Sequence, residues 1–464
     1  MNRVDLVFRT VGERTSDVAL QMAIKNIQPN KVHVLDNVRP FWRTVHEMLR
    51  INHDCDFVVY LDADSIILED MRPFLNWNNR AYVDCYVHDR FRGKVHCGCH
   101  ITRIDLVREM AKVAPPVDDL PYVLRPESRI RSFALQELNE SKYVHNFAIL
   151  HDHFQSFYDI FQKYGLRELR CRTPEKLALL ESAQQFWTDE PDYEVAQLAL
   201  EHAREHVPLD APPSTVNAYI ERLPEYARDV MLRHAIKEKA GFSMEELDRA
   251  EARLQQPRKN FNKVFGLGLS RTGTRSLTAG LQYLGFNISH YPTDEQTFQE
   301  LARGDHRFSL LEMHDGMTDI TVAPYYEELD RLYPGSKFVL TVRDEETWLQ
   351  SCENHWSGRD AFAPTKGSSE ESHMKIRRFL RAAVYGCYDF QPERFARVYR
   401  KHVDQVLDYF RDRPEDLLVM NVVGGEGFEK LCPFLGLPIP IKPFPHKGNR
   451  LTEQLQGANP APAG

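Results

Sequence analysis

The chain has 464 residues, which is long for one hydrophobic core, so we expect two or three domains. Hydrophobic residues make up 42% and charged residues 27%, as in ordinary globular proteins. The formal net charge of -8 argues against the strongly basic surface of a general nucleic-acid binder.

Membrane and disulfide signals are also missing from the sequence. No stretch approaches the ~18 apolar residues of a membrane span, and the first residues lack the apolar region of a signal peptide. The 8 cysteines are scattered rather than arranged as a dense disulfide framework. We therefore expect a cytoplasmic protein without a membrane span.

Residues 1–153 alternate short apolar runs with helical patterns. The runs at 4–8, 32–35 and 57–61 predict strands, and the segments 18–27 and 42–51 predict helices. The third run is continuously apolar, as expected of a strand buried on both faces. Alternation of strands and helices predicts an α/β domain with a largely parallel sheet.

The rest of the chain divides into three further segments. Residues 154–260 are rich in Glu, Leu, Ala, Arg and Gln at helical spacing, which predicts a helical connector. Residues 261–452 predict a second α/β domain, with strands at 264–267, 336–342 and 417–420 and a helix at 394–410. Residues 453–464 are rich in Gly, Ala and Pro, which predicts a disordered tail.

The strongest chemical signal is a turn rich in Gly, Ser and Thr between the strand at 264–267 and a helix. Such a turn aims backbone N–H groups and the positive helix end at one point, which favours binding of an oxyanion. Gly268 and Gly273 have the spacing of a Walker A loop, but Thr274 replaces the expected lysine and the cation is Arg271. The candidate phosphate-binding residues are Ser270, Arg271, Thr272, Gly273, Thr274, Arg275 and Ser276.

This turn resembles the 5′-phosphosulfate loop of bacterial-type sulfotransferases that use 3′-phosphoadenosine 5′-phosphosulfate (PAPS). The resemblance covers about residues 263–450 and includes a strand ending at Arg343, with Ser351 eight residues later on a helix. It implies a P-loop-type α/β fold and PAPS as the donor. Arg271 would contact the 5′-phosphate and the leaving oxygen, and Arg343 with Ser351 would bind the 3′-phosphate. Lys447 is a further candidate for the 3′-phosphate.

Sulfuryl transfer also needs a base that takes the acceptor's proton, and it requires no metal. His290, Asp315 and Asp319 lie between the two motifs, where the resemblance places acceptor-side residues. Each also has a structural interpretation, as a packed histidine or as turn aspartates. The family often reads Asp-X-Pro in this segment, whereas this chain reads Asp319-Ile320-Thr321.

A second chemical signal, Asp62-Ala63-Asp64, follows the buried strand predicted at 57–61. Carboxylates suit Mn²⁺ or Mg²⁺, which can neutralise a departing diphosphate. The alternative is a capped turn, in which Asp64 satisfies backbone groups. A Cys97-Gly98-Cys99 segment is not expected to bind zinc, because no second pair of ligands accompanies it.

The Asp-X-Asp segment and its strand resemble glycosyltransferases of the GT-A fold. The resemblance implies a nucleotide-sugar donor contacted by Thr10, Asp36 and Asp62, with a metal held by Asp62 and Asp64. GT-A domains often add a late histidine to the metal, and either His151 or His153 fits, with His151 preferred. If the enzyme inverts, its base would be a carboxylate, for which the candidates are Asp118, Asp119 and Asp152.

The sequence therefore predicts a glycosyltransferase fused to a PAPS-dependent sulfotransferase, acting on a glycan, a glycolipid or a small glycoside. Three alternatives stay open. The amino-terminal domain would be a non-catalytic glycan-recognition module, the carboxy-terminal domain would be a P-loop kinase, or both would bind ligands without turnover.

Overall fold

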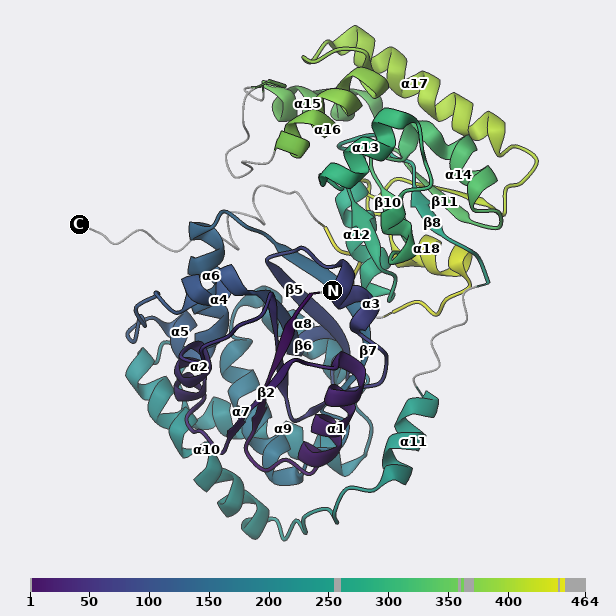
Figure 1. Cartoon of the computed structure of the whole chain (residues 1–464). Helices are drawn as coiled ribbons and strands as arrows, with labels where there is room; N and C mark the ends of the chain where they lie inside the picture. The colour runs from purple at the N-terminus through teal and green to yellow at the C-terminus, as the bar shows by residue number, and fades with distance from the viewer. Residues whose placement is uncertain (1, 254–259, 358–359, 363–370, 441–442, 447–464) are drawn as a thin grey trace. The chain divides into compact units, whose positions relative to one another are not determined.

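The computed structural model describes residues 2–253, 260–357, 360–362, 371–440 and 443–446 (Figure 1). The chain forms two compact units, Met1–Gln255 and Gln256–Gly464, each of which is described separately below. Within the described residues, no helix has the length and apolar character needed to cross a membrane. The tail predicted at 453–464 and Lys447 lie outside the described residues.

The first unit contains a mixed seven-stranded sheet of order β2-β1-β3-β6-β5-β7-β4. Strand β1 pairs parallel with β2 and β3, as the alternating pattern predicts, whereas β6 runs antiparallel to both β3 and β5. The strands are β1 Val4–Thr10, β2 Lys31–Asp36, β3 Phe57–Asp62, β4 Ser65–Ile67, β5 Tyr82–Asp89, β6 Gly93–Arg103 and β7 Lys142–His151.

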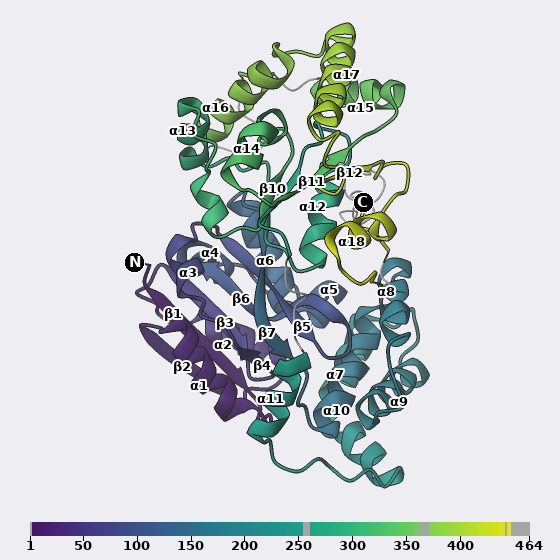
Figure 2. The same ribbon diagram turned by 90° about the vertical axis from the view of Figure 1, so that its right-hand side faces the viewer.

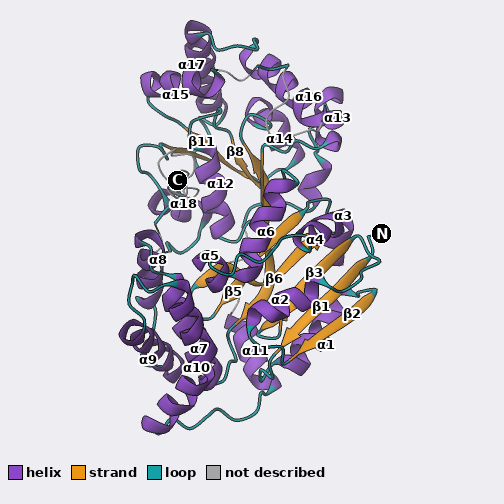
Figure 3. Cartoon of the chain, turned by 90° about the vertical axis from the view of Figure 1, so that its left-hand side faces the viewer, coloured by secondary structure: helices purple, strands orange, loops and turns teal. Residues whose placement is uncertain are grey.

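Helices α2, α4 and α6 cover one face of this sheet (Figure 3). Their apolar side chains pack on Val58 and Tyr60 of β3 in one core, and Val58 and Tyr60 are fully buried. Residues 57–61 are buried throughout, which confirms the expectation from their continuous apolar run. The helices that flank the sheet are α1 Ser16–Ile27, α2 Phe41–Leu49, α3 Arg72–Trp77, α4 Ile104–Met110, α5 Leu120–Leu124 and α6 Pro126–Glu137.

The helical segment after β7 forms a second core in the same unit (Figure 2). Phe161 and Tyr164 of α7 pack with Ala199 and Leu200 of α9, and Phe91 from the β5–β6 turn joins them. The segment is thus packed against the sheet domain, because its apolar stripes meet side chains of that domain. Its helices are α7 Phe157–Arg170, α8 Pro174–Gln184, α9 Pro191–His206, α10 Pro213–Arg233 and α11 Met244–Arg253.

The second unit contains a parallel five-stranded sheet of order β12-β11-β8-β10-β9. The first strand, β8, lies at the centre, so the chain adds strands on one side of it and later on the other. Ligands bind at such a reversal, outside the carboxyl ends of the strands. The strands are β8 Val264–Gly266, β9 Ile288–His290, β10 Gly316–Thr318, β11 Lys337–Thr341 and β12 Leu417–Met420.

Helices surround this second sheet, together with short 3-10 turns at Ser309–Glu312 and Ala323–Tyr325. A core formed by α12, α18 and the inner strands contains Leu277, Leu281, Val339 and Leu431, all fully buried. Both units are therefore α/β, as the sequence predicts. The helices are α12 Thr274–Tyr283, α13 Glu295–Arg303, α14 Tyr326–Leu332, α15 Glu345–Trp356, α16 Glu371–Leu380, α17 Pro392–Tyr409 and α18 Phe428–Leu435, with a π-helical turn at Arg381–Tyr385.

Candidate functional sites

The loop between β8 and α12 is held in an unusual backbone path. Gly273 caps α12 with φ of 103°, a region that glycine adopts without steric cost. A Cβ on Gly268 would lie 1.7 Å from Thr341 Oγ1, so only glycine fits against β11 there. The hydroxyl of Thr272 donates to the Leu269 carbonyl at 2.7 Å and closes the turn. The N-terminus of α12 is thereby exposed to an anion at the carboxyl edge of the sheet.

Two arginines converge on this loop from different elements. Arg271, with φ of 74°, donates through Nε to Ser351 Oγ on α15 at 3.0 Å. Arg343, just after β11, donates through Nη1 to the Arg271 carbonyl at 3.4 Å. Partial burial and then the like charge of Arg271 lower the pKa of Arg343. Two guanidinium groups beside a helix N-terminus are suited to bind a doubly charged anion.

The position of Arg343 is fixed in part by Tyr399, which the sequence analysis did not identify. Its backbone N–H donates to Tyr399 Oη at 2.9 Å, and the Tyr399 hydroxyl donates to the Arg343 carbonyl at 2.5 Å. Trp348 donates through Nε1 to the Ser270 carbonyl at 2.9 Å and so ties α15 to the loop. Tyr399 lies on α17, more than fifty residues from Arg343, and no local spacing links the two.

Asp319 braces the loop from the end of β10. Its carboxylate accepts hydrogen bonds from Ser270 at 3.1 Å and from Thr274 at 2.5 Å. His290, at the end of β9, places Nε2 3.9 Å from Asp319 Oδ2, and its Nδ1 lies 3.0 Å from Thr318 Oγ1. Burial lowers the pKa of His290. A neutral imidazole beside the loop can therefore accept a proton, whereas the Asp319 oxygens are already engaged.

Asp315 is not part of this arrangement. It precedes β10, at the opposite end from Asp319, and its carboxylate accepts the Asn287 N–H at 2.7 Å. Arg275 is exposed on the first turn of α12, whereas Ser276 is buried there. The structure thus brings together Ser270, Arg271, Thr272, Gly273, Thr274, His290, Asp319, Arg343 and Ser351.

In the first unit, the Asp-X-Asp segment lies at the end of β3, as predicted, but its two carboxylates have different partners. Asp62 accepts a hydrogen bond from Arg9 Nε at 2.7 Å, and Arg9 donates in turn to Glu127 at 2.7 Å. Burial, together with the nearby Asp64, raises the pKa of Asp62 to about 6. Arg9 and Glu127 form a buried pair that local spacing does not indicate, because 118 residues separate them.

Asp64 belongs to a separate cluster with His151 and Asp152, whose ligand atoms lie within 4.8 Å of one another. His151 Nε2 lies 3.6 Å from Asp64 Oδ1, and its Nδ1 lies 2.8 Å from Asp89 Oδ2. The Lys163 ammonium, from α7, donates to both Asp64 and Asp152. Burial raises the pKa of Asp64, but Lys163 and His151 outweigh it and hold that pKa below its usual value. The carboxylates of Asp64 and Asp152 therefore share one cation, the Lys163 ammonium.

The donor set of this cluster fits Mn²⁺ or Mg²⁺, with two carboxylates and one imidazole held by Asp89 in a fixed orientation. Asp64 and His151 are brought together as the sequence predicts, Asp152 joins them, and Asp62 instead pairs with Arg9. No motif in the sequence marks Lys163 in advance.

The remaining predicted residues of this unit lie around that edge. Thr10 and Asp36 are paired in register at the carboxyl ends of β1 and β2. The Nε2 atom of His153 lies 3.2 Å from the carbonyl oxygen of His88. Asp119 forms an ion pair with Arg129 at 2.6 Å. Asp118 is exposed, and Cys97 lies in a group with Asp89 and His151.

Comparisons with known proteins bear mainly on the second unit. Residues 263–452 match the family model of the sulfotransferase domain. Ava biosynthesis cluster protein M of Aspergillus versicolor is 26% identical over 213 residues, which cover 40% of this chain and 80% of that protein.

Two solved glycosyltransferases show weak structural likeness to the chain. One is involved in the glycosylation of the major capsid of PBCV-1 and is 10% identical, with a TM-score of 0.24. The match covers 32% of this chain and 94% of that glycosyltransferase chain. The apo-form of GlyE from Streptococcus pneumoniae is 11% identical with a TM-score of 0.21. The match covers 75% of this chain and 88% of the GlyE chain. The loop, the paired arginines and the family match together identify residues 263–452 as a sulfotransferase domain.

Proposed function

We propose that the second unit transfers a sulfuryl group from PAPS to a hydroxyl group of a glycan or glycoside. The observation that carries this proposal is the convergence of Arg271, Arg343 and Ser351 beside the amino end of α12. PAPS carries phosphate at both the 3′ and 5′ positions, so it needs two anchoring points. Arg343 with Ser351 supplies one, and the loop amides with Arg271 supply the other.

In this proposal, the acceptor oxygen attacks sulfur while the bond from sulfur to the 5′-phosphate oxygen breaks. The acceptor's proton passes to His290, which burial keeps neutral. The negative charge that develops on the leaving phosphate is stabilised by Arg271 and by the N–H groups of the loop. Asp319 holds the hydroxyls of Ser270 and Thr274, and so keeps the loop in its anion-binding form.

A shallow, open depression of about 560 Å³ on α13, α16 and the π-helical turn is our candidate for the acceptor's binding place. Phe298, Phe379 and Tyr388 line it together with Lys375 and Arg378. Aromatic faces suit the apolar side of a sugar ring. Lys375 pairs with Glu371 at 3.1 Å, so Arg378 is the cation that would favour an acceptor with negative charge.

The test is calorimetric titration with adenosine 3′,5′-bisphosphate, the desulfated donor, beside ATP. We expect the bisphosphate to bind more tightly than ATP, and Arg343→Ala to weaken it by about 100-fold, because two charge-assisted hydrogen bonds are lost. Arg331→Ala, on the exposed face of α14, is the matched control. Tighter binding of ATP, or bisphosphate binding indifferent to Arg343, would overturn the assignment and favour the kinase alternative.

We further propose that the first unit is a metal-dependent glycosyltransferase that uses a nucleotide sugar. The supporting observation is the cluster of Asp64, His151 and Asp152 at the carboxyl edge of the sheet, whose charge is balanced by Lys163. When bound there, Mn²⁺ or Mg²⁺ would neutralise the diphosphate of the donor. Lys163 would then bind a phosphate oxygen, while Thr10 and Asp36 lie at the strand ends where the nucleoside would bind.

This second proposal is tested by nucleotide-sugar hydrolysis measured with and without Mn²⁺ over a panel of donors. We expect Mn²⁺-dependent hydrolysis that Asp64→Ala abolishes. If no donor is hydrolysed while sulfation proceeds normally in Asp64→Ala, the first unit is a glycan-recognition module instead. The two assays use different ligands, so the proposals for the two units are tested independently.

A further inference from the structure

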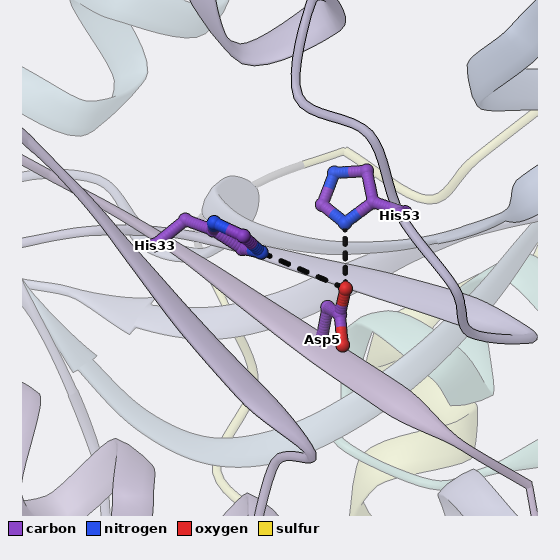
Figure 4. Close-up of side chains that lie close together, drawn as sticks. All are labelled: Asp5, His33 and His53. Carbon is purple, nitrogen blue, oxygen red and sulfur yellow. Dashed lines mark hydrogen bonds and ion pairs between the residues drawn. The ribbon is translucent and has the colours of Figure 1, made fainter.

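A second group of metal-ligating side chains lies at the opposite ends of the strands, away from Asp64. It consists of Asp5 near the start of β1, His33 on β2 and His53 in the segment before β3 (Figure 4). One oxygen, Asp5 Oδ2, faces both rings, 2.7 Å from His53 Nδ1 and 3.7 Å from His33 Nε2. Asp5 lies at the amino end of β1 and Thr10 at its carboxyl end, about 16 Å apart at the usual rise per residue.

Hydrogen bonding alone leaves this group incompletely satisfied. The side chains of Asp5 and His53 are each 1% exposed. The ligand atom His33 Nε2, which faces Asp5 Oδ2, is buried without a hydrogen-bond partner. Among the residues that the structure describes, no lysine or arginine forms an ion pair with Asp5. A buried carboxylate without a cation is costly, and proteins resolve that cost by pairing the charge or by coordinating a metal.

The geometry points to a zinc-class divalent ion held by Asp5 Oδ2, His53 Nδ1 and His33 Nε2. A tetrahedral ion with metal–nitrogen bonds of about 2.0–2.1 Å sets its ligand atoms roughly 3.3 Å apart, between the two observed separations. Two imidazoles and one carboxylate favour Zn²⁺ over Mg²⁺ or Ca²⁺, which prefer oxygen. The three side chains supply three ligands, and a water molecule would complete the tetrahedron.

The position of the site assigns it a structural role. Strand β2 is the edge of the sheet, and only His33 and Leu35 on it are even partly buried. Little apolar contact therefore holds β2 against β1. A metal shared by His33, Asp5 and His53 would link β2, β1 and the entry to β3 at one point. Such a link would stabilise the sheet. It would take no part in reactions at the Asp64 cluster, which lies at the opposite ends of the strands.

The test is metal content of the full chain after removal of metals and reloading with Zn²⁺ or Co²⁺. We expect Asp5→Asn, His33→Gln and His53→Gln each to bind one fewer equivalent than the wild type. The visible Co²⁺ bands of a four-coordinate site should be lost as well. His46→Gln, a half-buried histidine bonded to Tyr122 in the same unit, is the matched control and should keep the full content.

Thermal unfolding separates a metal site from a hydrogen-bond network. Binding to the folded state raises Tm, so Zn²⁺ should stabilise wild type and His46→Gln but not His33→Gln. His33 is on the partly exposed edge strand, so this variant is the one expected to fold. Equal metal content in wild type and His33→Gln, with the same Tm increase on adding Zn²⁺, would overturn the proposal whatever the variants do to stability.

Discussion

The two units place opposite charges at the same kind of sheet edge. In the first unit, carboxylates converge and a lysine ammonium lies between Asp64 and Asp152. In the second, guanidinium groups converge beside a helix N-terminus, and the nearby acid, Asp319, is engaged by hydroxyls. In the proposed functions, the acids would bind a diphosphate through a metal, whereas the guanidinium groups would bind a phosphosulfate directly. The comparison teaches that the residues at the strand ends can give two α/β sheets edges of opposite charge.

The largest expected effect is on Arg271, which defines the cationic route. Arg271→Ala should lower kcat/KM for sulfuryl transfer by about 10²–10³-fold, because it removes charge where charge develops on the leaving phosphate. Arg271→Lys should recover only part of that loss, since an ammonium cannot bridge two oxygens as a guanidinium does. Steady-state sulfation assays measure both. A rate in Arg271→Ala within a factor of two of wild type would contradict the assigned role.

Asp64 and Asp62 test the metal route. Asp64→Ala should reduce Mn²⁺-dependent nucleotide-sugar hydrolysis by about 10²-fold or more, because it removes a ligand of the metal that neutralises the diphosphate. Asp62→Asn should leave the Mn²⁺ affinity nearly unchanged, because Asp62 pairs with Arg9 outside the cluster. Mn²⁺ titration monitored by electron paramagnetic resonance separates the two. Equal loss of metal in both variants would place Asp62 among the ligands.

Lys163 sharpens the comparison, because it supplies the positive charge in the absence of metal. In metal-free protein, Lys163→Met should destabilise the fold by about 2–3 kcal/mol, since it leaves Asp64 and Asp152 without their shared cation. Added Mn²⁺ should restore more stability to the variant than to wild type, because the metal no longer competes with an ammonium. Thermal unfolding with and without Mn²⁺ measures this difference. An identical Mn²⁺ response in both proteins would contradict the assignment.

The smallest expected effect is a pH dependence of sulfation. Burial lowers the pKa of His290 below its usual value near 6.5, so the imidazole is already neutral at pH 7. Because a base acts in its deprotonated form, kcat/KM should be flat from pH 7 upward and fall only as pH drops below about 6.5. His290→Gln should lower kcat/KM and abolish its fall at low pH. If kcat/KM of His290→Gln still fell at low pH, the titrating group would be another residue.

Local patterns predicted much of the fold and marked the segments in which the candidate site residues lie. The run at 57–61 and the strand–helix alternation marked both α/β units, because burial on two faces and the periods of strand and helix are properties of neighbouring residues. The loop from Ser270 to Thr274 was likewise predictable, since a strand, a turn and a helix N-terminus follow one another in the chain. The antiparallel strand β6 and the packing of α7 and α9 were not, because they depend on partners far along the chain.

The sequence by itself determined which segments bear charge at strand ends: Asp62 and Asp64 in one unit, and Arg271 and Arg343 in the other. Tertiary structure alone decided how those charges are compensated. It paired Asp62 with Arg9, brought Lys163 from α7 to Asp64, clamped Arg343 with Tyr399, and set Asp315 at the end of β10 away from the loop. The physical reason is that the electrostatic environment of a side chain is set by distance in space, whereas spacing in the sequence reports only on neighbours along one element.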